Sequence, residues 1–246
     1  MALQEEFGRA GNWLFRRRSY LPLVLVALFL LSLPDYRYLG NSERIEHLWQ
    51  VLCLAVGFAG LGIRAYTIGH TPGRTSGRNS RAQVAEQLNT TGIYSLLRHP
   101  LYVGNFFMFF SVILLPHSYW LALVFILLYM LYYERIMYAE EAFLRGKFGA
   151  SYSEWAERTP AVLPRFSAFV PPKLDFSLRN VLRREYNGFF ALIACMFVIE
   201  TVQDYVVQQR LKLDLHWLII LGVSFLLWAV LRLLNKKTRL LKVEGR

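Results

Sequence analysis

Six apolar stretches constrain what this chain can fold into more than any other feature of its sequence. They cover residues 20–34, 47–68, 102–115, 119–138, 188–207 and 216–234. A helix needs roughly 20 residues to cross a hydrocarbon layer about 30 Å thick. With 55% hydrophobic residues and a mean hydropathy of +0.30, the chain is too apolar for an ordinary soluble domain of 246 residues. We therefore predict an all-α, polytopic integral membrane protein, a single membrane domain of about six transmembrane helices.

The boundaries of these spans follow from polar and turn residues. The first stretch, 20–34, is short, and we expect its helix to extend backwards through Trp13 and Phe15. It does not resemble a signal peptide, because Pro34 and charged residues follow it in place of a small-residue cleavage site. The sequence Pro-His-Ser at 116–118 separates the third and fourth stretches and predicts a tight helical hairpin.

The basic residues predict the orientation of the helices. Of the 28 Lys and Arg residues, 24 lie in alternate connections or in the two terminal segments. Cytoplasmic loops carry this excess, so we expect both termini and the connections 70–100 and 134–166 to be cytoplasmic. The net charge of +11 is then spread along one membrane face. This argues against nucleic acid as a partner and for anionic lipid.

Two cysteines and one glutamate within the apolar stretches do not form a recognisable motif. Cys53 and Cys195 both fall in apolar stretches without metal-ligand spacing, so we expect neither a disulfide nor a metal site. Glu200 lies within the fifth stretch and is either a functional intramembrane acid or a solvated residue near the outer interface beside Asp204.

The two long cytoplasmic connections are the candidate site. In residues 70–100, we expect a short helix over 81–88 and a second one from Ile93, which ends before Pro100 because the residue before proline disfavours helix. His99 would then sit at a fixed break at the mouth of the third span. In residues 134–166, Glu141 and Arg145 have the spacing of a simple surface i,i+4 pair, which is an alternative to a role at a site.

Three sequence strings together resemble one family of membrane enzymes. They are TTGIYS at 90–95, RHPLYVGN at 98–105 and EEAFLRGKFGASY at 140–152. Their order and spacing, with a helical hairpin between the last two, resemble the isoprenylcysteine carboxyl methyltransferase and phospholipid methyltransferase superfamily. The resemblance covers residues 64–166 and leaves out the first span and the last two.

The resemblance implies a membrane-embedded site for S-adenosylmethionine. Such a site is unrelated to that of the soluble Rossmann-type methyltransferases. By this resemblance the catalytic residues are Arg98, His99, Glu140 and Glu141. The residues that it implies for cofactor binding are Asn79, Gln87, Leu88, Asn89, Tyr94, His99, Pro100, Tyr102 and Glu140. Arg135 and Arg81 are the candidates for substrate binding. Arg135 is one residue out of the register of prenylcysteine enzymes, and Glu86 and Asn89 stand where those enzymes often have His and Val.

The expected function is methyl transfer from S-adenosylmethionine to a membrane-embedded acceptor. The acceptor is a lipid head group or phosphate, or a prenylcysteine carboxylate, so lipid or lipidated substrate is the expected partner. Two alternatives stay open: a membrane reductase of the sterol-reductase type that uses NADPH, and a non-catalytic membrane scaffold. The sequence does not indicate the oligomeric state.

Overall fold

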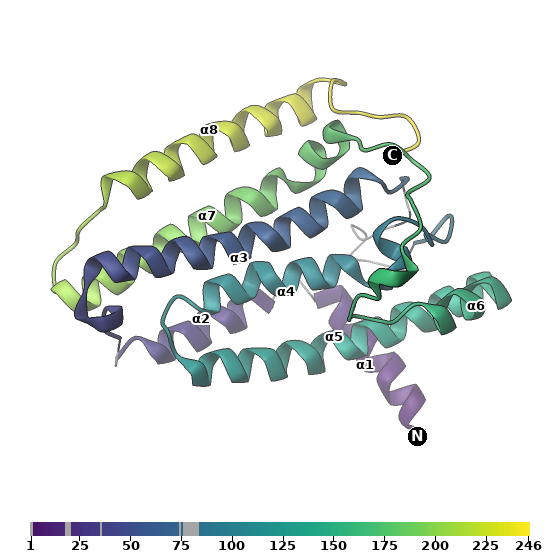
Figure 1. The fold of residues 1–246 in the computed structure, drawn as a ribbon, viewed down its shortest axis with the longest axis horizontal. Helices are drawn as coiled ribbons and strands as arrows, with labels where there is room; N and C mark the ends of the chain where they lie inside the picture. The colour runs from purple at the N-terminus through teal and green to yellow at the C-terminus, as the bar shows by residue number, and fades with distance from the viewer. Residues whose placement is uncertain (1, 18–20, 35, 74, 76–83) are drawn as a thin grey trace.

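A computed structural model describes residues 2–17, 21–34, 36–73, 75 and 84–246. Eight α-helices make up most of this part of the chain (Figure 1). They are α1 (Leu3–Arg17), α2 (Leu21–Ser32), α3 (Glu43–Gly69), α4 (Pro100–Ile113), α5 (Tyr119–Phe148), α6 (Ala150–Arg158), α7 (Leu178–Gln208) and α8 (Leu215–Lys237). Single 3-10 turns occur at Leu39–Asn41, Ile93–Ser95 and Phe166–Ala168. The described residues form no strand, only one isolated bridge between Gly92 and Val170.

The helices confirm the all-α membrane architecture. Four of those described, α3, α5, α7 and α8, are long and apolar enough to cross a membrane. The shorter α2 and α4 lie alongside them, so the protein has about six spans. Many large apolar side chains, such as Leu127, Leu131, Val223 and Leu226, point away from the other helices and are exposed, as lipid-facing residues would be.

The long helices lie roughly side by side in the order α8, α7, α3, α4, α5, as contacts and Figure 1 show. Helices α3 and α4 approach closely, since a Cβ on Gly60 would stand 2.5 Å from the Gly104 carbonyl oxygen. Aromatic rings in tilted and edge-to-face contacts, among them Phe106, Phe125 and Tyr129, fill the seam between α4 and α5. Helix α6, α1 and the C-terminus lie at one end of this bundle (Figure 1).

The predicted hairpin is confirmed. Helix α4 ends at Ile113, His117 has a φ of 51°, and Ser118 caps α5 by accepting a hydrogen bond from the backbone N–H of Leu121. A left-handed residue ends the turn and the serine starts the next helix, as the Pro-His-Ser sequence indicated.

Two expectations about helix extent were wrong. Trp13 and Phe15 do not extend the first span; they belong to α1, a separate amphipathic helix that packs on α5 through Gly11. Residues 84–88, the described part of the expected 81–88 helix, are not helical, since Asn89 to Gly92 offers turn chemistry and no apolar face repeats. The chain after α8 turns back onto the bundle, where the Gly245 carbonyl accepts from the Gly73 N–H.

Candidate active site

The Arg-His-Pro element holds its two polar side chains at a break in the chain. Pro100 is the first residue of α4, and His99 precedes it with φ −122° and ψ 57°, outside the helical region. The backbone N–H groups of Arg98 and His99 donate to the carbonyls of Pro160 and Ala161, at 2.9 and 3.1 Å. The segment after α6 therefore fixes the backbone of the element, and His99 is only 6% exposed.

Two adjacent glutamates from the end of α5 meet this element. Glu141 Oε1 lies 2.9 Å from His99 Nε2 and 2.9 Å from Arg98 Nε. Glu140 Oε2 accepts a hydrogen bond of 2.9 Å from the Tyr102 hydroxyl and lies 3.8 Å from His99 Nδ1. The Glu141 carboxylate thus contacts both the Arg98 guanidinium and the His99 imidazole. The Glu140 side chain is more exposed, at 29%.

Helix α6 holds Arg98 and the segment before it in place. The Arg98 Nη1 group donates to the Ala156 carbonyl at 2.9 Å, and Trp155 Nε1 donates to the Tyr94 carbonyl at 3.1 Å. Tyr152 is fully buried, and its burial together with the nearby Glu141 charge raises the pKa of the phenol well above its usual value. The phenol therefore stays protonated beside the Glu141 carboxylate, which leaves its hydroxyl as a donor there.

A cavity of about 290 Å³ lies along the segment that precedes the Arg-His-Pro element. Four of the residues expected at the cofactor line it: Gln87, Leu88, Asn89 and Tyr94. Thr67, His70 and Thr71 contribute from the end of α3. Amide, hydroxyl and imidazole groups next to leucine and tyrosine give this cavity both hydrogen-bonding and apolar walls, as ligand sites usually have.

The C-terminal segment closes one wall of the same cavity, which the sequence did not predict. Glu244, Gly245 and Arg246 line it. The backbone N–H of Gly73 donates to the Gly245 carbonyl at 2.7 Å, and Arg246 Nη1 donates to the Gly69 carbonyl at 2.7 Å.

The sequence-predicted residues thus fall into two adjoining groups. Arg98, His99, Tyr102, Glu140 and Glu141 form the carboxylate cluster, and Pro100 sets its backbone. Gln87, Leu88, Asn89 and Tyr94 line the cavity, joined to the cluster by the short segment 95–97. Asn79 and Arg81 lie outside the described residues.

Arg135 is not part of either group. Its guanidinium lies over the ring of Phe7 in α1, 4.7 Å from the ring centroid. Its backbone carbonyl is the close neighbour of Gly11. The role in substrate binding therefore has no support from its position, because Arg135 points to the α1 side of α5.

Sequence reasoning missed a polar contact that joins α3 and α4 to α7. Arg64 of α3 pairs with both oxygens of Glu185 in α7, at 2.7 and 2.8 Å, and donates to Asn105 of α4 at 2.5 Å. Arg64 lies within the apolar stretch 47–68. A charged residue inside an apolar helix usually has a partner, and this signal could have suggested a pair with Glu185.

Comparisons with known proteins find one family and several relatives. The phospholipid methyltransferase family matches residues 48–151. The nickel-cobalt-cadmium resistance protein NccN of Alcaligenes xylosoxydans xylosoxydans is 32% identical over 160 residues, which cover 64% of this chain and 70% of that protein. The cobalt-zinc-cadmium resistance protein CzcN of Cupriavidus metallidurans is 33% identical over 161 residues, 64% of this chain and 68% of that protein.

A eukaryotic enzyme matches a shorter region. The protein-S-isoprenylcysteine O-methyltransferase of Schizosaccharomyces pombe is 34% identical over 77 residues, which cover 31% of this chain and 33% of that enzyme. No solved structure matches the chain.

Proposed function

Because the chain belongs to the isoprenylcysteine and phospholipid methyltransferase superfamily of membrane proteins, we propose that it transfers a methyl group from S-adenosylmethionine to a lipid or lipidated acceptor. The observation that carries this proposal is the meeting of Arg98, His99 and Tyr102 with Glu140 and Glu141. The segment that leads into Arg98 lines a polar cavity. The reaction would take place where α4 begins and α5 ends.

The residues fit the cofactor in charge and in hydrogen bonding. S-adenosylmethionine would supply a methyl carbon activated by a sulfonium, and it carries an ammonium, a carboxylate and an adenosine. Gln87 and Asn89 offer amide donors and acceptors for the nucleoside, and Leu88 offers an apolar wall. Glu140 keeps acceptor capacity beyond its bond from Tyr102 and can hold an ammonium.

The two glutamates have different roles in this proposal. Glu141 is a positioning residue, since its carboxylate is already engaged by Arg98 and His99. Glu140, the more exposed of the two, would bind the ammonium of the cofactor. The aromatic seam of α4 and α5 continues from the cluster, where Tyr102 and Tyr133 lie 4.8 Å apart, and it would exclude water from the acceptor. Positioning and dehydration are the effects expected to speed a displacement of this kind.

The acceptor is tested by following the methyl group. Membranes that contain the protein would be incubated with methyl-labelled S-adenosylmethionine and separated into lipid and protein. Label in lipid identifies a lipid acceptor, and protein label released by mild base identifies a carboxyl methyl ester. Glu140→Gln should remove the label, while Glu154→Gln, the same change at an exposed position on α6, should not. Equal labelling by wild type and Glu140→Gln would contradict the proposal.

The bacterial relatives are named for resistance to nickel, cobalt, zinc and cadmium. We extend our proposal to this property: methyl transfer by this chain raises the tolerance of its cell for such cations. A deletion strain should grow less well in their presence, and the wild-type gene should restore growth while Glu140→Gln should not. Rescue by Glu140→Gln would separate tolerance from methyl transfer.

A further inference from the structure

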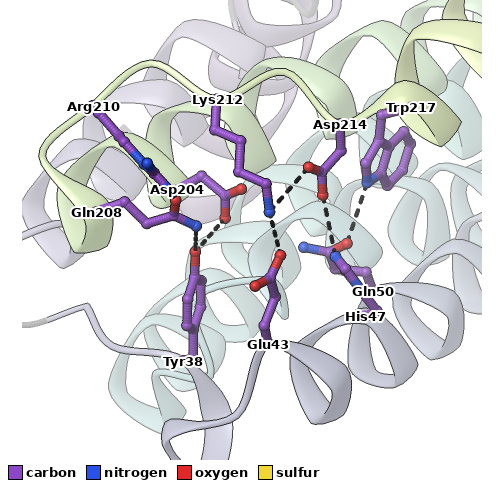
Figure 2. A network of polar contacts seen from close by, with 10 residues as sticks. All are labelled: Tyr38, Glu43, His47, Gln50, Asp204, Gln208, Arg210, Lys212, Asp214 and Trp217. Atoms are coloured by element: carbon purple, nitrogen blue, oxygen red, sulfur yellow. Dashed lines mark hydrogen bonds and ion pairs between the residues drawn. The ribbon is translucent and has the colours of Figure 1, made fainter.

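A second polar network lies at the other end of the bundle, where α3 begins and the loop between α7 and α8 turns (Figure 2). Asp204 accepts a hydrogen bond of 2.9 Å from the Tyr38 hydroxyl. Asp214 lies 3.3 Å from His47 Nε2 and 3.2 Å from Lys212 Nζ. Helix α3 spans 27 residues, about 40 Å at 1.5 Å per residue, so this network is a bilayer thickness away from the candidate active site.

Three carboxylates converge in this network. Oxygen atoms of Glu200, Asp204 and Asp214 all lie within 4.8 Å of one another. The three residues are 1%, 4% and 8% exposed. Two come from one face of α7 and the third from the residue before α8, so the fold itself brings them together.

Glu200 has no partner within this cluster. Both of its carboxylate oxygens are buried and make no hydrogen bond to any described group, and the same is true of Asp204 Oδ2. Gln203, 1% exposed and on the same stretch of α7, also has an unpartnered amide oxygen and nitrogen. Buried polar groups in proteins are normally satisfied, and carboxylates most of all. These oxygens therefore point to a ligand.

The charges of the cluster indicate what kind of ligand. Three carboxylates carry up to three negative charges, and the one ammonium in contact with them among the described residues is that of Lys212. Lys212 is shared with the more exposed Glu43. A bound dication would balance the two remaining charges of the buried group. Carboxylate and amide oxygens are ligands of divalent cations.

We propose that Glu200, Asp204 and Asp214 bind one divalent cation, which fastens the α7–α8 turn to the N-terminal end of α3. Gln203 is a further candidate oxygen ligand. His47 Nε2 contacts Asp214 Oδ2 at 3.3 Å and orients this carboxylate. The ring of His216 lies 5.1 Å from that of His47 and completes a second close group with Asp214. The spacing of these residues in the sequence, 47, 200, 204 and 214, gave no metal motif.

The proposal rests on the far end of the bundle and not on the methyl-transfer site, so the two can fail separately. Full-length protein in lipid nanodiscs would be titrated with Mn²⁺, and free Mn²⁺ would be followed by its electron paramagnetic resonance signal. We expect one bound ion for the wild type, with affinity reduced at least about tenfold in Glu200→Gln and in Asp204→Asn. Glu140→Gln, which changes the carboxylate pair at the other end, should bind Mn²⁺ as the wild type does.

Thermal unfolding of the same samples guards against variants that fail to fold. Mn²⁺ should raise the unfolding midpoint of the wild type relative to a chelator, and should leave that of Glu200→Gln unchanged. If Mn²⁺ gives the wild type and Glu200→Gln the same affinity and the same midpoint shift, or no shift in either, the proposal is wrong and Glu200 is a protonated acid.

Discussion

The carboxylates at the two ends of the bundle differ in how their charges are met. At one end, Glu141 has an imidazole and a guanidinium within 2.9 Å, and Glu140 accepts from a phenol while 29% of its side chain stays exposed. At the other end, Glu200 is 1% exposed and both of its oxygens lack a hydrogen-bond partner. In the first pair both carboxylates have protein partners, and the Glu140 side chain stays partly exposed. The second group is incomplete without a ligand.

This difference separates two uses of acidic residues near membrane boundaries. Partners within the protein fix a carboxylate in one orientation, which suits recognition of a cofactor or substrate that comes and goes. Buried carboxylates without partners are costly unless a cation or a proton neutralises them. Glu185 is the reference case between the two, because it is buried and both of its oxygens are bound by Arg64.

The largest expected effect is at the pair with partners. Glu140→Gln keeps size and shape but removes the charge proposed to hold the ammonium of the cofactor, so we expect methyl transfer to fall on the order of 1,000-fold. Glu200→Gln should leave the rate of methyl transfer within about twofold of the wild-type rate, because Glu200 lies at the other end of the bundle. The measurement is the initial rate of label incorporation. A comparable loss in both variants would mean that the two ends are not independent.

The second effect concerns the fully paired carboxylate. Arg64→Met leaves Glu185 buried without its cation and should lower the free energy of unfolding by about 3 kcal/mol. The double variant Arg64→Met, Glu185→Leu should recover most of this loss, since no charge then stays unpaired. Arg179→Met, an exposed arginine on α7, is the control. Denaturation in detergent micelles measures all four proteins, and a loss in the double variant as large as in the single one would argue that packing and not charge is responsible.

A third, smaller effect has the opposite sign. In the presence of a chelator, Glu200→Gln should raise the free energy of unfolding by about 1 to 2 kcal/mol, because it removes one charge from an unpaired buried group. Glu185→Gln on the same helix should instead lower it. Chemical denaturation with and without Mn²⁺ checks both signs. Destabilisation of the cation-free protein by Glu200→Gln would show that Glu200 already has an adequate partner.

The sequence was sufficient to predict features that depend on local chemistry. The hairpin at 116–118 and the break before Pro100 follow from proline and turn residues, and the structure contains both. The all-helical membrane fold follows from the apolar stretches. The helix expected over 81–88 is absent from its described part because Asn89 to Gly92 favours turns over an extended amphipathic helix.

Long-range pairing could not be predicted in this way. Arg64 and Glu185 are 121 residues apart, and His47 and Asp214 are 167 apart. Hydropathy gives the spans but not which of them are neighbours or how each is rotated. Arg135 lies against Phe7 because of the position of α1. The sequence had predicted that these N-terminal residues continue the helix of the first span.

The smallest expected effect tests the donor that the acidic cluster does have. Burial raises the pKa of Tyr38 to about 12, and its hydroxyl donates to Asp204 Oδ1. Because the folded protein holds this proton more tightly than the unfolded chain, whose tyrosines titrate near pH 10, the resulting stability is complete below about pH 10 and is lost as the pH rises towards 12. Tyr38→Phe should cost about 1 kcal/mol at pH 8.

The alkaline decline should be shallower in Tyr38→Phe than in the wild type, and the two stability curves should converge near pH 12. Denaturation at a series of pH values from 8 to about 12 gives both curves. Because Tyr38 orients Asp204 without being a ligand itself, Tyr38→Phe should also weaken Mn²⁺ binding only a few-fold, far less than Glu200→Gln. If Tyr38→Phe abolished Mn²⁺ binding while Glu200→Gln preserved it, the cation would lie outside the three-carboxylate cluster.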